Sequence, residues 1–517
     1  MDDNTPVIIG VGEASERIDA ADYRALSPAD LAGLAAAAAV ADAGGAPDLA
    51  AHIQVIAAIR QFEVSGPRAV APFGRADNFP RAVARRIGAD PARAILEPVG
   101  GQGPQHLVNE FAQSIGAGET DLALLVGSEA ISTVRHLSSR GETRDWSEAI
   151  GGELEDRGFG EALMTAELPR HGARTPISVY AMFENARRAR LGLGRDAYAL
   201  EMGRLFAPFT QVAAGNPHAM SRDVHSAEAL ATVTAANRLT SDPYPRRMVA
   251  RDQANQGAAV LMASVGKARA LGVPESRWVY LLGGADARER TPVERADLST
   301  GPASVLAIRR ALDVAGLAPE EVAAFDFYSC FPIAVFNVRD GLGIQPDDPR
   351  PLTVTGGLPY FGGAGNNYSM HAIAEMVRRL RAAPGEVGLV AANGGFLSKY
   401  SVGVYSTGAA PWRGFDSKAL QAEIDGWTAP AVAPGEGAGV VDTYTIDYSG
   451  PAPVATVVGR LDDGGERFVA MTDPADAGLA QRMIETEPLG AAVAMSMNDD
   501  GRSIIGAFTP ASPADRL

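Results

Sequence analysis

The sequence predicts an α/β protein made of two similar βα halves, with an insertion in the first half and a small antiparallel β-domain after the second. Three observations lead to this fold class. Short apolar runs typical of buried strands alternate with helical stretches along most of the chain. One order of elements occurs twice, with an offset of about 260–275 residues. Beyond residue 440 the pattern changes to strand runs joined by Asp-Gly turns.

The first elements are marked by their end signals. Residues 6–12 (PVIIGVG) are apolar and predict a buried strand. Ser27, Pro28 and Asp30 predict the start of a helix, because serine caps the first N–H groups and proline fits the first helical position. This Ala-rich helix is expected to end at the two glycines that begin at Gly44. Residues 52–61 predict the next strand.

The internal repeat joins four elements in each half. Residues 34–44 and 55–59 resemble residues 308–316 and 322–327. The turn GGQG at 100–103, a helix and the run 121–127 resemble the turn GGAG at 362–365, a helix and the run 387–394. The shared order favours a duplication over a chance likeness between generic βαβ patterns.

The domain boundaries follow from these patterns. We expect a first half at 1–275 with an insertion at 128–244, and a second half at 276–406. Residues 407–439 are rich in Gly, Pro and Ala and predict a linker to the β-domain at 440–517. Within that domain, two hairpins are expected, one from 454–461 to 466–471 and one from 491–497 to 503–508.

Composition excludes several classes of protein. The balance of 46 basic and 62 acidic residues gives a net charge of −16, which argues against non-specific binding to nucleic acid or to an anionic membrane. The only cysteine, Cys330, excludes an internal disulfide framework and fits a reducing, cytoplasmic compartment. We expect no signal peptide, no membrane span and no metal site, because the start is acidic, no apolar run approaches 18 residues, and no segment has metal-ligand spacing.

Three turns carry residues with chemistry. The turn at Gly100, Gly101 and Gln102 can present backbone N–H groups to an oxyanion, or it can be a simple chain reversal. Tyr328 and Cys330 come together at the end of a strand, where open α/β sheets hold active sites, although a free cysteine is most often a buried apolar residue. The third turn, at 356–371, contributes further candidates. They are Tyr360, Gly363, Asn366, Asn367 and Tyr368.

The order and spacing of these turns, with the repeated halves and the insertion, resemble the thiolase superfamily. Residues 246–260 (RRMVARDQANQGAAV) resemble the corresponding stretch of sterol-carrier-protein-type thiolases. With its β-rich tail the chain is most similar to thiolase-like proteins of type 1, which have an extra C-terminal OB-like domain. The resemblance covers residues 6–405. It implies the five-layered αβαβα thiolase fold, an acyl-CoA ligand without a further cofactor, and a body through which relatives commonly form homodimers.

The departures from the family pattern bear on the reaction. Gly100 stands where the resemblance places the nucleophilic cysteine, so no acyl-cysteine can form there. The family's His-Asp-Cys-Phe motif is present with Tyr328 in place of His and with Cys330 retained. The Gly-His-Pro turn corresponds to residues 362–364 (GGA), and the late Cys-x-Gly motif begins with Asn393. Thiolysis through an activated thiolate is therefore not expected.

Three functions stay open. The first is retro-aldol cleavage or formation of a C–C bond next to a CoA thioester, with a tyrosine as base, Cys330 as acid or base, and the asparagines as oxyanion donors. The fused β-domain would then replace the OB-fold partner of thiolase-like aldolases. The second is a catalytically silent protein that binds acyl-CoA. The third is acetyl-CoA acetyltransferase chemistry through Cys330. For all three functions we expect that the CoA phosphates could be bound by Arg246, Arg247 and Arg251. An arginine cluster that is simply exposed to solvent explains these residues equally well.

Overall fold

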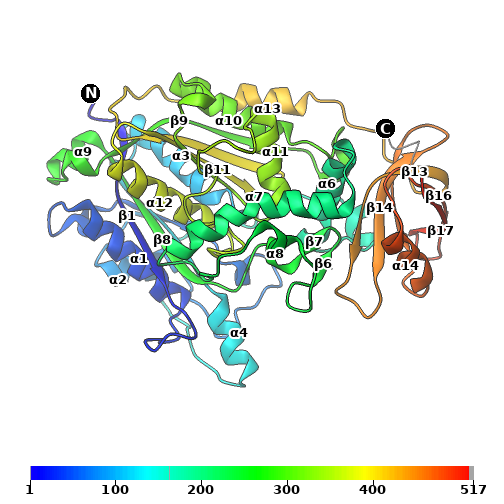
Figure 1. Cartoon of the computed structure of the whole chain (residues 1–517). Helices are drawn as coiled ribbons and strands as arrows, with labels where there is room; N and C mark the ends of the chain where they lie inside the picture. The colour runs from blue at the N-terminus through cyan, green and yellow to red at the C-terminus, as the bar shows by residue number, and fades with distance from the viewer. Residues whose placement is uncertain (1, 162, 512–517) are drawn as a thin grey trace.

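The computed structural model describes residues 2–161 and 163–511 and contains one large sheet and one small barrel (Figure 1). The large sheet has ten strands in the order β10-β11-β12-β9-β1-β8-β4-β2-β3-β5. The predicted fold class is confirmed, because each half contributes one side of this sheet and the two sides meet where β1 pairs with β9.

The first half contains five strands and four helices outside the insertion. Its strands are β1 (Pro6–Ser15), β2 (Val55–Ile59), β3 (Arg93–Glu97), β4 (Leu122–Ala130) and β8 (Asn255–Ser264). Its helices are α1 (Pro28–Ala43), α2 (Phe79–Ile87), α3 (Gly103–Gly116) and α9 (Val265–Ala270). Ser27 caps α1 as expected, and its side chain accepts from the N–H of Asp30.

The second half repeats the pairing pattern of the first. Its strands are β9 (Val279–Arg288), β10 (Ala324–Phe327), β11 (Val387–Gly394) and β12 (Lys399–Ser406), and its helices are α10 (Pro302–Ala315), α11 (Pro332–Leu342) and α12 (Tyr368–Ala382). From the centre outward, β1-β8-β4-β2 and β9-β12-β11-β10 each contain two antiparallel pairings followed by a parallel one. The common pattern supports the duplication inferred from the sequence.

Three layers of helices and the two sides of the sheet alternate to form five layers. Helices α1 and α2 cover the outer face of the first half, and α10 covers that of the second. Helices α3 and α12 contact each other and strands of both halves, so they form the central layer. Close packing explains the glycines of the first strand. A Cβ on Gly10 would lie 2.1 Å from the carbonyl oxygen of Ala39, and one on Gly12 equally close to that of Ala35.

The insertion joins both sheets. It contains α4 (Ile131–Ser139), β5 (Glu155–Asp156), α5 (Glu167–Arg170), α6 (Pro176–Arg190), α7 (Arg195–Gly215), α8 (Ala227–Ala231), β6 (Leu239–Ser241) and β7 (Tyr244–Pro245). Strand β5 pairs in parallel with β3, the outermost long strand of the first half. The insertion therefore covers part of an edge that would otherwise present free backbone groups.

The C-terminal domain is a closed barrel of five strands. These are β13 (Gly437–Asp447), β14 (Val454–Leu461), β15 (Arg467–Thr472), β16 (Ala492–Met497) and β17 (Ser503–Thr509), with α14 (Ala477–Glu485) between β15 and β16. The order β13-β14-β15-β17-β16 closes on β13, and only the β15–β17 pairing is parallel. The two hairpins are the β14–β15 and β16–β17 pairs, and the five-stranded closure agrees with the OB-like expectation.

Buried polar contacts attach the barrel to the insertion. The Arg188 guanidinium is 1% exposed and forms an ion pair with Glu487 at 2.6 Å. Asn185 donates to the carbonyl oxygen of Tyr444 at 3.0 Å, and β6 pairs with the end of β13. Burial of an arginine is expensive unless it is paired, so these contacts hold the two parts in one arrangement.

The segment 407–439, expected as a linker, contains a helix of its own. Helix α13 (Lys418–Asp425) packs on β9 and α10, with Leu420 and Ile424 buried. An amphipathic pattern hidden among Gly, Pro and Ala residues accounts for the difference. In the part of the chain that the structure describes, no helix is long and apolar enough to cross a membrane.

Candidate functional site

A cavity of about 1090 Å³ opens where the two halves and the insertion meet. The turn before α3, the end of β10, the end of β11 and the turn before α12 come from the two halves. The insertion adds the first turn of α6, and the segment 246–253, which follows the insertion in the first half, adds most of its residues. Both repeated glycine turns thus reach one cavity, because the carboxyl ends of the parallel strands lie at the same edge of the sheet.

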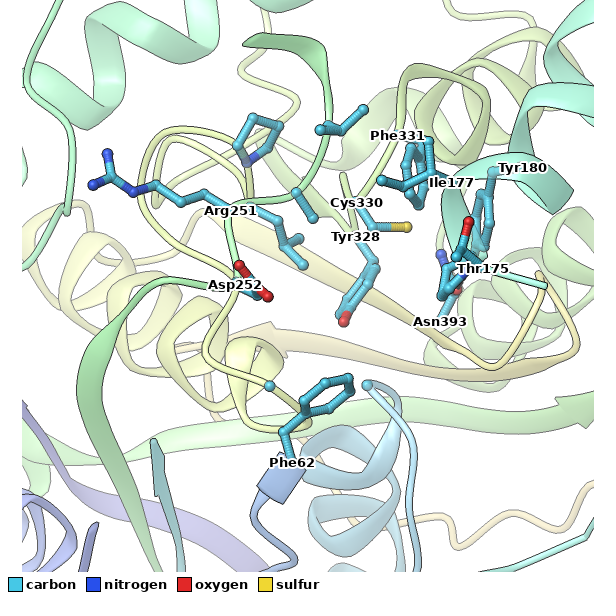
Figure 2. A pocket seen from close by; sticks show the side chains of 18 of the residues that line it. Phe62, Thr175, Ile177, Tyr180, Arg251, Asp252, Tyr328, Cys330, Phe331 and Asn393 are labelled. Carbon is cyan, nitrogen blue, oxygen red and sulfur yellow. Dashed lines mark hydrogen bonds between the residues drawn. The ribbon is translucent and has the colours of Figure 1, made fainter. Parts of the chain in front are cut away.

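Tyr328 and Cys330 lie at the centre of the cavity, just after β10 (Figure 2). The Tyr328 side chain rests against the first glycine turn. A Cβ built on Gly101 would lie 2.3 Å from the Tyr328 hydroxyl oxygen and 2.7 Å from the carbonyl oxygen of Asn393. Gly101 is therefore needed for this close approach between the two halves.

Cys330 is 7% exposed and faces a group of hydrogen-bonding side chains. The Tyr180 hydroxyl of α6 lies 3.2 Å from Asn393 Oδ1 and 3.0 Å from the carbonyl oxygen of Gly395. Figure 2 shows Tyr180 and Asn393 on the same side of the thiol, with Phe331 beside them. The rings of Tyr180 and Phe331 are 4.4 Å apart, which fixes the tyrosine in place.

Burial keeps both central groups protonated at neutral pH. It raises the pKa of the Cys330 thiol to about 12, although hydrogen bonds with Tyr180 and Asn393 oppose the rise. Burial raises the pKa of the Tyr328 hydroxyl well above its usual range, and the charge of a Cys330 thiolate would raise it further. At pH 7 the site therefore presents proton donors rather than a thiolate nucleophile.

The first glycine turn has backbone groups available for a ligand. Side chains of the second half hold its carbonyl groups: Lys399 Nζ donates to Val99 O at 2.8 Å, and the Ser369 hydroxyl donates to Gly101 O at 2.7 Å. Among residues 2–161 and 163–511, nothing accepts from the N–H groups of Gly100 and Gly101. Both glycines line the cavity, so these donors suit a ligand oxygen.

The turn before α12 supplies Gly363 and Asn366 to the cavity wall. Asn366 Nδ2 donates to Arg60 O at 2.9 Å and to the Ser65 hydroxyl at 3.0 Å. Tyr360 also lines the cavity. Its hydroxyl is buried with no hydrogen-bond partner in the described part of the chain, and burial raises its pKa above the usual range, with Arg247 opposing.

Three of the expected site residues do not line the cavity. Tyr368 is fully buried and its hydroxyl hydrogen bonds with Thr355 at 2.6 Å and with Asp326 at 3.1 Å. The side chains of Gln102 and Asn367 contain buried polar atoms that have no partner among the described residues. Tyr368 instead supports Tyr328 from behind, since the two rings meet edge to face at 5.4 Å.

The expected arginines gather on one wall. Arg246, Arg247 and Arg251 all line the cavity, and none of their guanidinium groups forms an ion pair within the described ranges. Burial lowers the pKa of Arg251, as do the neighbouring charges of Arg17 and Arg246. Figure 2 shows Arg251 on the side of Tyr328 that lies opposite Tyr180, so the arginines and the hydrogen-bonding group around Tyr180 flank the central pair.

Sequence reasoning missed several lining residues. Phe62 and Phe159 are 52% and 40% exposed at the cavity, and Tyr180, Arg238 and Lys399 also line it. They come from loops, a helix and a strand that contain none of the three turns, so no local pattern indicated them. No group of three or more His, Cys, Asp or Glu side chains in the described ranges is suited to hold a metal ion.

Comparison with known proteins identifies both parts of the chain. Residues 419–501 match the family model of the thiolase-like protein type 1 additional C-terminal domain. The crystal structure of a monomeric SCP2-thiolase-like protein type 1 from Mycobacterium smegmatis is 45% identical, with a TM-score of 0.83, and the match covers 98% of this chain and 99% of that one. No curated protein sequence matches the chain.

More distant structures share the fold. The Ltp2-ChsH2(DUF35) aldolase is 20% identical with a TM-score of 0.58, and the match covers 78% of this chain and 98% of that one. The dimeric peroxisomal thiolase of Saccharomyces cerevisiae is 15% identical with a TM-score of 0.54 and the same coverage of 78% and 98%. The expectation of a homodimer gains no support from the Mycobacterium smegmatis protein, which is described as monomeric. On the identity and coverage of that match, this chain belongs to the SCP2-thiolase-like protein type 1 family.

Proposed function

We propose that this protein binds an acyl-CoA thioester in the cavity and makes or breaks a C–C bond next to the thioester, without an acyl-cysteine. The observation that carries the proposal is the combination of a buried, protonated thiol with two free N–H groups of a glycine turn in one cavity. The three arginines without ion pairs are suited to the phosphates of CoA. A protein of the same fold is described as an aldolase.

Retro-aldol cleavage of a 3-hydroxyacyl-CoA requires stabilisation of an enolate. The bond between the second and third carbon atoms breaks, a ketone or aldehyde leaves, and the electron pair moves to the thioester oxygen. We assign the N–H groups of Gly100 and Gly101 to that oxygen, because donors fixed before the reaction stabilise charge as it develops. We assign to Cys330 the transfer of a proton to the second carbon, since its thiol is protonated at neutral pH.

The reaction also needs a base that removes the proton from the 3-hydroxyl group of the substrate. We assign it to Tyr328, which has no hydrogen-bond partner for its hydroxyl among the described residues and reaches into the cavity. Its raised pKa means that the phenolate is scarce at neutral pH. Cleavage should therefore accelerate as the pH rises above neutral, because the phenolate fraction increases about tenfold per pH unit while the phenolate is the minor form.

A catalytically silent acyl-CoA-binding protein is the second candidate. The glycine at position 100 and the protonation of both central groups favour it. Acetyltransferase chemistry through Cys330 ranks lower, since it needs a thiolate and the site raises the pKa of the thiol.

Product analysis separates these candidates. The protein is incubated with a panel of 3-hydroxyacyl-CoA and 3-ketoacyl-CoA thioesters, with and without free CoA, and products are followed by mass spectrometry. We expect a shortened CoA ester plus a ketone or aldehyde without added CoA. The Y328F variant should lose this activity, whereas Y448F, which removes a phenol of the barrel, should retain it.

Two outcomes would overturn the proposal. Cleavage that depends on free CoA would assign thiolysis to the protein. Intact substrates with tight CoA binding, measured by calorimetry, would assign the silent binding function.

We also propose that the protein is a monomer. Strand β5 occupies the edge of β3, which leaves less of that edge for pairing with a second copy. The monomeric state of the Mycobacterium smegmatis relative agrees with this proposal.

A further inference from the structure

The chain contains only three lysines, and one of them lines the cavity. Lys399 starts β12, and its ammonium group donates to Val99 O, the carbonyl group that precedes Gly100. Within residues 2–161 and 163–511 this is the one acceptor for its three protons. Lys399 is thus half-buried beside the first glycine turn with donor capacity left over.

The surroundings of Lys399 favour the neutral amine more than an exposed site would. Burial lowers the pKa of Lys399, and the charge of Arg288 lowers it further. Glu161 and Glu97 oppose this change. These carboxylates are themselves engaged, because Glu161 forms an ion pair with Arg288 and Glu97 forms one with Arg157 at 2.9 Å.

We propose that Lys399 is an acylation site, whose side-chain amine takes the acyl group from a CoA thioester bound in the cavity. This inference rests on the acyl-CoA binding of the proposed function. Its structural basis is the position of Nζ, which is 2.8 Å from the backbone of the glycine turn that is assigned to the thioester oxygen. Holding an amine and a thioester in one cavity makes their reaction effectively unimolecular.

The reaction balances without any further reagent. The Lys399 ammonium loses one proton to water, and the free amine attacks the thioester carbonyl carbon. The C–S bond breaks, CoA leaves as its thiolate, and the second nitrogen proton is lost as the thiolate gains one. The products are an amide on Nζ, free CoA and one proton released to solvent.

Acylation would block the site in which it occurs. The amide keeps only one N–H, carries no charge and places the acyl chain in the cavity next to Gly100. The modification is therefore self-limiting. A thioester that remains bound without being converted would acylate Lys399, and the modified protein would no longer bind a further thioester.

The other two lysines provide controls within the same chain. Lys418 is exposed on α13, and Lys267 is half-buried on α9. Neither lines the cavity. The full chain is incubated with acetyl-CoA, digested with a protease that cleaves after glutamate, and the acetylation of each lysine is followed over time by mass spectrometry.

We expect Lys399 to be acetylated at least about tenfold faster than Lys418, since only its amine shares a cavity with the thioester. Desulfo-CoA, which binds without a thioester, should suppress acetylation of Lys399 and leave Lys418 unchanged. Equal rates at the lysines, or a Lys399 rate that desulfo-CoA does not change, would overturn the inference.

Calorimetry separates this inference from the proposed function. Binding of desulfo-CoA is measured on the wild-type protein and on K418R, which changes a lysine outside the cavity and should leave binding unchanged. If desulfo-CoA binds but Lys399 stays unmodified in the wild-type protein, the acylation site fails and acyl-CoA binding stands. If desulfo-CoA does not bind, both proposals fail.

Discussion

Replacing Gly101 with alanine tests how closely the two halves meet at the site. An alanine Cβ would lie 2.3 Å from the hydroxyl oxygen of Tyr328, 2.5 Å from its Cζ and 2.7 Å from the carbonyl oxygen of Asn393. Carbon atoms need about 3.5 Å or more, so something must shift. The Asn393 carbonyl belongs to strand β11 and is held by the sheet, so we expect Tyr328 to be displaced.

The cost is that of overpacking a buried contact, about 1–3 kcal/mol. Gly101 does not have a positive φ, so the effect measures space alone and not backbone strain. The assay is urea unfolding, with the proposed retro-aldol turnover as a second readout. G101A should unfold at lower urea concentration and lose turnover to a similar extent as Y328F.

Gly103 provides a matched control two residues further on. Its Cβ would lie 3.3 Å from Ile59 Cδ1, the flexible end of a side chain, and 3.6 Å from Glu97 Cγ. Because Gly103 starts α3, alanine there should change stability by less than about 1 kcal/mol. A double-mutant cycle with Y328A isolates the tyrosine contact, since the part of the G101A cost caused by Tyr328 disappears when the ring is absent. Wild-type stability and turnover in G101A would refute the placement of Tyr328 against the turn.

Three further predictions concern other parts of the structure. His171 accepts from the N–H of Ser503 in the barrel, and burial lowers the pKa of this histidine, so the free energy of unfolding should decrease as the pH falls below 6.5 and the unfolded chain takes up a proton. The H171Q variant should lose less stability than the wild type when urea unfolding is compared at pH 5 and pH 7.5. Burial raises the pKa of Glu129 to about 8 from 4.5, so the stability that its protonated form provides should be lost as the pH rises from 4.5 through 8. In E129Q the free energy of unfolding, measured in the same assay, should depend less on pH. Substituting proline for both Glu155 and Asp156 should remove β5 and expose the edge of β3, so light scattering should detect self-association of this variant. A variant that stays strictly monomeric would contradict the protective role of β5.

The sequence by itself determined the elements and their repetition. Strand runs, helix caps and glycine turns are local signals, and Ser27 at α1 or the hairpins of the barrel depend on neighbours within a few residues. The repeated order of elements then predicted two alike halves, and the matching strand pairings support it. The motifs also placed Tyr328, Cys330 and Asn393 at strand ends, where the cavity lies.

Only the tertiary structure decided which side chains share the cavity and in which protonation state. Tyr328 and Tyr368 were both candidates from the sequence, yet one faces the cavity and the other hydrogen bonds with buried Asp326. Tyr180 and Lys399 join the site from a distant helix and strand, and no pattern in their own segments indicates it. The physical reason is that burial and approach between segments far apart in the chain set both the direction of a side chain and its pKa, and neither quantity exists before the halves pack together.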